Sequence, residues 1–225
     1  MKLVAVVGSP HGMEGITGGL TGAAVDAAEA AGAEVACVAL EGPNVQACID
    51  CSACITGDGL CVLEDGLSEA TLKLREADCI LLASPTYFAH VSGQMKCFLD
   101  RQLSGYFAQD LRGKYGAVIT TASGMGHEEA AAYLSRYLNL MGVAVADVLA
   151  VAGLTREAAL TEETLGRAAK LGRGLVAAAQ ARTSYPEQDE LIRHAFDEAV
   201  GAVRSMPAVF RYAHPRMVER GWIKA

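Results

Sequence analysis

Four cysteines lie close together in one short segment, where they could bind a metal or carry redox chemistry. Cys48, Cys51, Cys54 and Cys61 have the spacing C-x2-C-x2-C-x6-C. Structural zinc sites usually combine two separated cysteine or histidine pairs, so three evenly spaced cysteines fit zinc poorly. Three such cysteines can instead bind three irons of one [4Fe–4S] cluster, while the fourth thiolate comes from nearby. The spacing therefore favours one cluster over a zinc ion, and free or redox-active thiols are the alternative.

A glycine-rich segment near the amino terminus has the composition of an anion-binding turn. Residues 8–20, GSPHGMEGITGGL, contain five glycines together with Ser9 and Thr17. A glycine-rich turn that enters a helix directs backbone N–H groups and the positive end of the helix dipole at an anion. The segment lacks the Gly-Lys-Ser/Thr of a P-loop and the G-x-G-x-x-G of dinucleotide-binding folds. It suits a monophosphate held without a metal, and an ordinary glycine-rich turn is the alternative.

The elements that position these segments follow from alternating apolar runs and helical patterns. Predicted strands cover residues 2–8, 34–40, 79–84, 115–122 and 143–151. Predicted helices cover residues 16–31, 65–77, 91–103, 128–141 and 155–182. Strands that are apolar on both faces belong to a parallel sheet with helices on both sides. We therefore predict an α/β fold with a doubly wound, five-stranded parallel sheet of the flavodoxin type, which binds ligands at the carboxyl ends of its strands.

The length of 225 residues fits one large domain with an appendage. We assign residues 1–182 to the flavodoxin-like domain, with the cysteine segment 48–61 as one of its loops. Residues 183–225 form a C-terminal extension of one helix and an aromatic tail, which packs on the domain or serves as an oligomer arm. Pro186 and a capping-box pattern at residues 184–187 predict where the helix of this extension begins.

Composition excludes several classes of partner. The formal net charge is −7, and an acidic chain lacks the basic surface that nucleic-acid binding needs. No apolar stretch is long enough for a transmembrane helix, and no signal peptide is recognisable. We therefore expect a cytoplasmic protein with no nucleic-acid or membrane partner. The reducing cytoplasm disfavours structural disulfides among its seven cysteines.

Several motifs occur in the order typical of the NADPH-dependent FMN reductase family, which this sequence resembles. The motifs are Gly8-Ser9-Pro10, Gly15-Ile16-Thr17, the three cysteines of residues 48–54, Cys61-Val-Leu-Glu-Asp65, Ala77-Asp78, Ser84-Pro-Thr-Tyr87, residues 91–96 and Asp100-Arg101. They cover most of residues 1–151, and the four compact cysteines resemble the iron–sulfur flavoproteins of that family. The resemblance implies a flavodoxin-like fold, FMN as cofactor, and NAD(P)H or a ferredoxin-like protein as electron donor.

Two positions differ from the phosphate loop of that family. The usual arginine of G-S-P-R is His11, and the usual asparagine of G-N-T is Ile16. Both changes remove phosphate ligands, so backbone amides, Ser9 and Thr17 must bind more of the phosphate, with His11 as a pH-dependent partner. We expect weaker retention of FMN than in members that keep both ligands.

The resemblance assigns the flavin contacts to three loops. The expected cofactor-binding residues are Ser9, Pro10, His11, Gly15, Ile16, Thr17, Ser84, Pro85, Thr86, Tyr87, Phe88, Ser123, Gly124 and Gly126. Packing of Tyr87 and Phe88 on neighbouring helices alone is the alternative for these two aromatics. Tyr87 and His90 are the candidates for catalysis, although a lone loop histidine is more often solvated. His127 is expected to help start the next helix.

Together these features predict a flavin-dependent oxidoreductase or electron carrier with FMN and one [4Fe–4S] cluster. Such a protein passes electrons between a one-electron carrier and a two-electron acceptor. A clusterless NAD(P)H-dependent FMN or quinone reductase is one alternative, and a non-enzymatic binding module is another. Because members of the family commonly form dimers or tetramers, we expect a homodimer or homotetramer. The 91–101 helix and the aromatic tail are the candidate interface elements.

Overall fold

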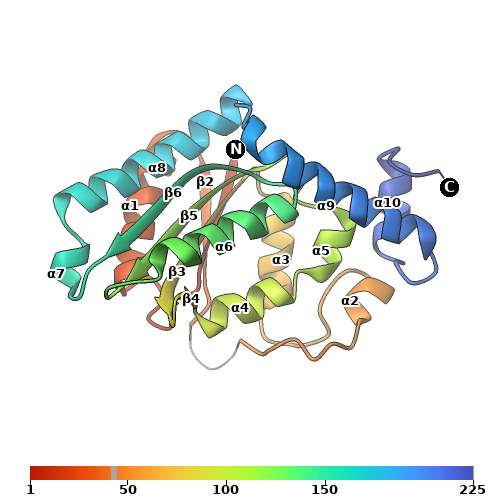
Figure 1. Cartoon of the computed structure of the whole chain (residues 1–225), viewed down its shortest axis with the longest axis horizontal. Coiled ribbons are helices and arrows are strands. Elements are labelled where there is room, and N and C mark those ends of the chain that lie inside the picture. The colour runs from red at the N-terminus through yellow and green to blue at the C-terminus, as the bar shows by residue number, and fades with distance from the viewer. Residues whose placement is uncertain (42–44, 225) are drawn as a thin grey trace.

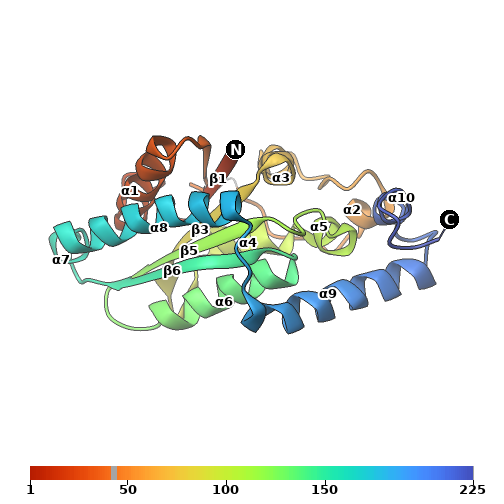
Figure 2. The same ribbon diagram turned by 90° about the horizontal axis from the view of Figure 1, so that it is seen from above.

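A twisted parallel sheet lies between two layers of helices in the computed structural model, which describes residues 1–41 and 45–224 (Figure 1; Figure 2). Its five parallel strands are β1 (Lys2–Val7), β2 (Glu34–Ala39), β3 (Cys79–Tyr87), β5 (Tyr115–Ala122) and β6 (Ala144–Ala152). Their order in the sheet is β2-β1-β3-β5-β6. The predicted flavodoxin-type sheet is therefore confirmed. A two-residue strand that was not predicted, β4 (His90–Val91), pairs antiparallel with the end of β3.

Alternate side chains along the strands enter two separate apolar cores. Leu3 and Ala5 of β1 face the first core, whereas Val4 and Val6 face the second. The first core is covered by α1 (Ile16–Ala30) and α8 (Glu162–Ala181). The second core is covered by α3 (Leu67–Glu76), α4 (Gly93–Asp100) and α6 (His127–Leu140). Burial on both faces explains why the central strands have continuous apolar runs rather than alternating ones.

Two predicted helices are each divided in the structure. The segment predicted as one helix over 91–103 forms α4. After a short break, a second helix follows as α5 (Leu103–Ala108). The predicted helix over 155–182 consists of α7 (Arg156–Ala159) and α8. Thr161 causes this second break, because its hydroxyl accepts a hydrogen bond from the Thr164 amide and so caps a new helix. A further short helix, α2 (Ala53–Thr56), lies inside the cysteine segment.

The C-terminal extension begins with α9 (Pro186–Ser205), and Pro186 is its first residue as predicted. The predicted capping box is wrong, because Tyr185 is the N-cap and makes no side-chain cap hydrogen bond. The Gln188 side chain instead attaches α9 to the edge strand β6. Its Nε2 donates to the Val145 carbonyl at 2.8 Å, and its Oε1 accepts from the Val145 amide at 2.8 Å. The side-chain Nδ2 of Asn139 also donates to Oε1 of Gln188, at 2.7 Å.

The aromatic tail packs on its own chain. Phe210 and Tyr212 are each 4% exposed. Trp222 contacts Phe196 of α9 edge to face, with ring centroids 5.1 Å apart. A last helix, α10 (Ala213–Glu219), follows Tyr212. None of the helices within residues 1–41 and 45–224 is long and apolar enough to cross a membrane.

Candidate functional site

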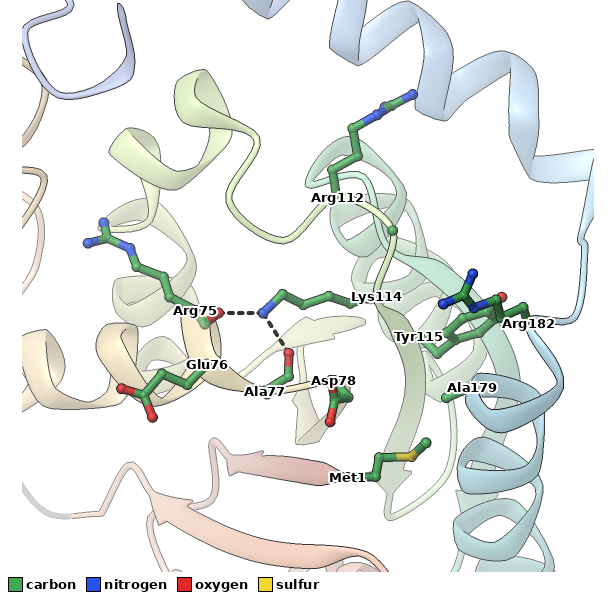
Figure 3. Close-up of a pocket in the computed structure, with 11 residues that line it drawn as sticks. Met1, Arg75, Glu76, Ala77, Asp78, Arg112, Lys114, Tyr115, Ala179 and Arg182 are labelled. Carbon is green, nitrogen blue, oxygen red and sulfur yellow. Dashed lines mark hydrogen bonds between the residues drawn. The ribbon is translucent and has the colours of Figure 1, made fainter. Parts of the chain in front are cut away.

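Two cavities lie at opposite ends of the strands. The larger, of about 640 Å³, lies where β3 and β5 begin (Figure 3). Lys114 projects into it, and its Nζ donates to the carbonyls of Leu74, Arg75 and Ala77 at 2.9, 2.6 and 2.6 Å. Burial lowers the pKa of Lys114 to about 8. Because all three donor positions of its ammonium are used to close the end of α3, this cavity offers no free cation at Lys114.

The second cavity, of about 240 Å³, lies at the carboxyl ends of the strands, where ligands bind in folds of this type. It is lined by Ser9, His11, Ile16, Thr17, Pro85, Thr86, Tyr87, Thr121, Ala122, Ser123 and Gly153. Eight of these belong to the predicted flavin site, so three separate loops meet where they were expected to meet. Sequence reasoning missed Thr121, Ala122 and Gly153. The last residues of β5 and the residue after β6 would have been found by extending the strand-end rule to every strand.

The first loop presents unused backbone amides to this cavity. Helix α1 begins after Gly15, which makes no side-chain cap hydrogen bond, and its first turn holds no acidic residue. The amides of that turn therefore have no partner within the helix. The loop is folded tightly, because a β-carbon at Gly18 would lie 2.3 Å from the backbone of Met13. Ser9 is buried, and its hydroxyl accepts from the His11 amide at 3.2 Å.

Two buried hydroxyls join this loop to the centre of the sheet. The Oγ1 atoms of Thr17 on α1 and Thr121 on β5 lie 2.7 Å apart. Both threonines line the cavity, and Thr17 is 2% exposed. The pair fixes the start of α1 against β5, and so fixes the direction in which the free amides point.

The last residues of β3 offer an unsatisfied polar atom to the cavity. Thr86 lines it, and its buried Oγ1 has no hydrogen-bond partner. Such buried hydroxyls are rare without a partner, and a bound molecule is a common explanation. Ser84, also predicted in the site, lies behind the cavity and is fully buried. Its hydroxyl donates to the Pro85 carbonyl and accepts from the Ser92 amide at 3.0 Å, so it supports the loop.

A tight hairpin joins β3 to β4 at the mouth of the cavity. Tyr87 pairs with His90, and the two residues between them have left-handed backbones, with φ of 49° at Phe88 and 59° at Ala89. Phe88 is fully exposed, so the alternative that it packs on helices is wrong. Tyr87 lines the cavity and is 48% exposed. His90 does not line the cavity, and its ring lies 4.3 Å from that of Tyr133.

The remaining predicted residues lie on these loops without lining the cavity; they are Pro10, Gly15, Phe88, Gly124 and Gly126. Gly126 instead lies against the hairpin, where a β-carbon would be 2.4 Å from Cα of Ala89. Helix α6 begins at His127, as predicted. The Nδ1 atom of His127 is buried without a hydrogen-bond partner.

The cysteine segment lies apart from the two apolar cores of the sheet. The exposure of its thiols decreases along the segment. Cys48 and Cys51 are exposed, whereas Cys54 and Cys61 are half-buried. Burial raises the pKa of Cys54, and negative charge on Cys61 and Cys48 raises it further. Within residues 1–41 and 45–224, no three His, Cys, Asp or Glu side chains are placed to hold a single metal ion. A cluster does not require that arrangement, because each cysteine binds a different iron.

The backbone around Cys51 is unusual. Asp50 and Ser52, on either side of it, have φ of 52° and 57°. Left-handed conformations are uncommon in residues other than glycine, and they concentrate where function requires a particular backbone path. They turn the chain sharply on both sides of one thiol.

A buried ion pair ties both ends of the cysteine segment to α4. The side chains of Arg101 and Asp65 are 1% and 3% exposed, and they form a bidentate salt bridge. Asp65 accepts from the Gln46 amide at 2.9 Å, and Arg101 donates to the Gln46 carbonyl at 3.1 Å. Arg101 also donates to the Leu63 carbonyl at 3.4 Å. Burial raises the pKa of Asp65, but Arg101 and two backbone amides outweigh burial and hold that pKa below its usual value.

Comparison with known proteins agrees with this geometry. Residues 1–156 match the family model described as NADPH-dependent FMN reductase. An iron–sulfur flavoprotein of Archaeoglobus fulgidus is 32% identical over 191 residues, which cover 84% of this chain and 86% of that protein. An iron–sulfur flavoprotein of Methanosarcina thermophila is 30% identical over 172 residues, covering 74% of this chain and 87% of the relative.

Solved structures support the fold. The NAD(P)H:quinone oxidoreductase from Methanothermobacter marburgensis has a TM-score of 0.61 and is 16% identical. The match covers 78% of this chain and 96% of that structure. At this identity the likeness concerns the fold alone, and it agrees with the sheet order and the two helical layers.

Proposed function

This chain belongs to the NADPH-dependent FMN reductase family, and we propose that it is a flavin-dependent oxidoreductase that binds FMN and one [4Fe–4S] cluster. In this proposal it passes electrons between a one-electron carrier, such as a ferredoxin-like protein, and a two-electron acceptor. The observation that carries the flavin part is the cavity in which the loops after β1, β3 and β5 meet. The curated relatives named iron–sulfur flavoproteins support the cluster.

The first loop has the chemistry to bind the FMN phosphate. The free amides at the start of α1 and the hydroxyls of Ser9 and Thr17 are donors suited to a dianion. His11 is the one side chain at this cavity that can add positive charge. Among residues 1–41 and 45–224, neither arginine nor lysine lines the cavity, so we infer that phosphate binding rests mainly on neutral donors.

The end of β3 and the loop after β5 fit the flavin ring. Thr86 brings a buried hydroxyl that needs a partner, and Tyr87 brings aromatic surface that is half-exposed at the mouth. Ring systems carry polar edges and apolar faces, so one unsatisfied hydroxyl and one aromatic side chain match both features. Bound FMN would supply the ability to exchange one or two electrons. The protein residues would orient it and limit its contact with water.

The cysteine segment has the donors for the cluster. Four thiols lie within fourteen residues of one segment, and two of them, Cys48 and Cys51, are exposed. Arg101 and Asp65 hold the two ends of the segment, which limits how far the four thiols can separate. We therefore assign Cys48, Cys51, Cys54 and Cys61 as the ligands.

Purification without oxygen tests both cofactors separately. We expect flavin absorbance peaks and, independently, about four iron atoms with matching acid-labile sulfide per chain. Cys61→Ser should lose iron and sulfide but keep FMN. Cys97→Ser, which changes a half-buried cysteine on α4, is the matched control and should keep both. Wild-type protein with flavin but no iron would overturn the cluster assignment and favour the clusterless NAD(P)H-dependent reductase.

The electron donor is tested by reducing the same preparation in two ways. We expect a chemically reduced ferredoxin to bleach the flavin faster than NADPH alone does. The reverse order would contradict the one-electron donor. Light scattering tests the expected homodimer or homotetramer, and a monomer at micromolar concentration would remove it.

A further inference from the structure

A third group of buried side chains joins the end of the chain to the cysteine segment. Ile55 of α2 packs with Phe210, Tyr212 and Met217 of the tail, and Cys54 lies against the same group. The Tyr212 amide reaches the Ile55 carbonyl at 3.4 Å. Figures 1 and 2 both show α10 beside α2, although more than 150 residues separate them in the chain. One small core therefore belongs partly to the cysteine segment and partly to the tail.

The Tyr212 ring lies directly on Gly59, between Cys54 and Cys61. A β-carbon at Gly59 would lie 2.3 Å from the ring, which is closer than any real contact. Two cations contact the ring, with Arg75 at 4.6 Å and Arg216 at 4.0 Å from its centroid. The segment and the tail are thus fitted together without space for one methyl group.

Asp110 links the tail to the same glycine through side chains. It is nearly buried, and it accepts from the Tyr212 hydroxyl at 2.6 Å and from Arg220 at 3.2 Å. Arg75 lies 3.1 Å from the same carboxylate and donates to the Gly59 carbonyl at 2.7 Å. A continuous chain of polar contacts therefore runs from α10 through Asp110 and Arg75 to the cysteine segment.

Charge along the chain favours the same contact. Residues 3–72, which include the cysteine segment, contain ten acidic residues and no lysine or arginine. Residues 206–224 contain four basic residues and one acidic residue. Opposite charge on the two segments draws them together, and this attraction weakens as salt rises.

From these contacts we propose that residues 206–224 form a latch on the cysteine segment, in which Tyr212 and Asp110 are positioning residues for Cys54. The proposal rests on the proposed function in one respect, because Cys54 matters to electron transfer as a ligand of the cluster. Without the latch, Ile55 of α2 loses its packing with Phe210, Tyr212 and Met217. Cys54 then becomes accessible to solvent.

The first experiment measures Cys54 in cluster-free protein, so its result does not depend on iron. Iodoacetamide labels the reduced full chain, and peptide mass spectrometry follows Cys54, with Cys97 as the internal reference. We expect Tyr212→Ala to speed labelling of Cys54 about tenfold relative to Cys97, because local opening no longer has to break the small core. Tyr212→Phe, which keeps the ring and loses the hydrogen bond to Asp110, should give a smaller increase.

Two glycines of the same region provide a matched pair. Gly59 and Gly66 have similar backbones, with φ of 91° and 82°, but only Gly59 touches the tail. Gly59→Ala should speed labelling of Cys54 as Tyr212→Ala does, and Gly66→Ala should leave it unchanged. Combining Gly59→Ala with Tyr212→Ala should add little to either single change, because both break the same contact. Fully additive effects would overturn the direct contact.

Trp222, the single tryptophan of the chain, reports on the tail itself. We expect its emission to shift to longer wavelength in Tyr212→Ala at moderate salt, in parallel with the faster labelling of Cys54. A shifted emission with unchanged labelling would show that the tail is not a latch and would overturn the proposal. In anaerobically purified protein the same variants should lose iron sooner in air than wild type. If wild type holds no iron, the cluster assignment fails while the labelling result still decides the latch.

Discussion

The hydroxyl oxygens of Thr17 and Thr121 lie 2.7 Å apart and join the first turn of α1 to the centre of the sheet. Thr17→Val should destabilise the flavin-free protein by about 1–3 kcal/mol, because the Thr121 hydroxyl stays buried without a partner. Thr17→Val with Thr121→Val should recover most of this loss, but it should not recover FMN affinity. Urea unfolding measures the first effect and FMN titration the second. Equal FMN affinity in wild type and the double variant would contradict a phosphate-binding role for Thr17.

Positive charge at position 11 should strengthen FMN binding. No arginine or lysine of the described part of the chain lines the cavity, and His11 is exposed on the first loop. His11→Arg should lower the Kd for FMN about fivefold at low salt, because a permanent guanidinium can bind the phosphate with two hydrogen bonds. Asp26→Asn changes the net charge by a similar amount ten residues along α1, and it should leave the Kd unchanged. An equal gain in both variants would indicate a general charge effect.

Removal of Arg101 should be costly, because it leaves Asp65 buried beside the cysteine segment. We expect Arg101→Met to lower the free energy of unfolding by about 3–5 kcal/mol. Changing both residues, Arg101→Met with Asp65→Leu, should recover much of that loss by removing the unpaired charge. Iron content should fall in both variants, since both lose the hydrogen bonds from Arg101 to the Gln46 and Leu63 carbonyls. Normal iron content in the double variant would show that the ion pair does not position the thiols.

Tyr212 should make the folded state sensitive to high pH. Burial and the hydrogen bond to Asp110 raise the pKa of Tyr212 to about 12 from its usual 10. Since the unfolded chain loses this proton first, the stabilisation is complete below pH 10 and is lost as pH rises from about 10 to 12. Tyr212→Phe has no such proton, so its free energy of unfolding should fall less over this interval. Parallel curves for the two proteins would contradict the assignment.

The hairpin at the mouth of the cavity should be strained at Ala89. Its φ of 59° costs energy in any residue with a β-carbon. Ala89→Gly should therefore stabilise the protein by about 1 kcal/mol, seen as a higher urea midpoint with an unchanged slope. Ala89→Val should act in the opposite direction, because β-branched residues tolerate this backbone least. A loss of stability in Ala89→Gly would show that the turn is not strained.

The sheet and the location of the site were predictable because they depend on repeated local patterns. Continuous apolar runs marked the central strands, and glycine and serine at their carboxyl ends marked the loops that meet at the cavity. The break at Thr161 was harder to see, since Thr155 to Arg182 has an almost uniform helical composition. The Thr161 hydroxyl caps α8 and so divides the segment into two helices.

Contacts between distant segments were not predictable from the sequence alone. Ser84 follows the family motif, yet its hydroxyl is used by Ser92 rather than directed into the cavity. Nothing in the pattern around Gly59 indicates that Tyr212 lies on it, because that contact joins segments about 150 residues apart in the chain. Side-chain partners of this kind depend on how finished elements pack, not on local composition.

The side-chain amide of Gln188 also affects whether a second copy of the chain can add a strand to the sheet. β6 is the last strand on its side of the sheet, and the backbone of such a strand is a template on which another chain can add. Gln188 occupies both the donor and the acceptor of Val145 with a side chain from a helix, which cannot be extended into a further strand. The helix that begins the C-terminal extension thus blocks the addition of a further strand at Val145.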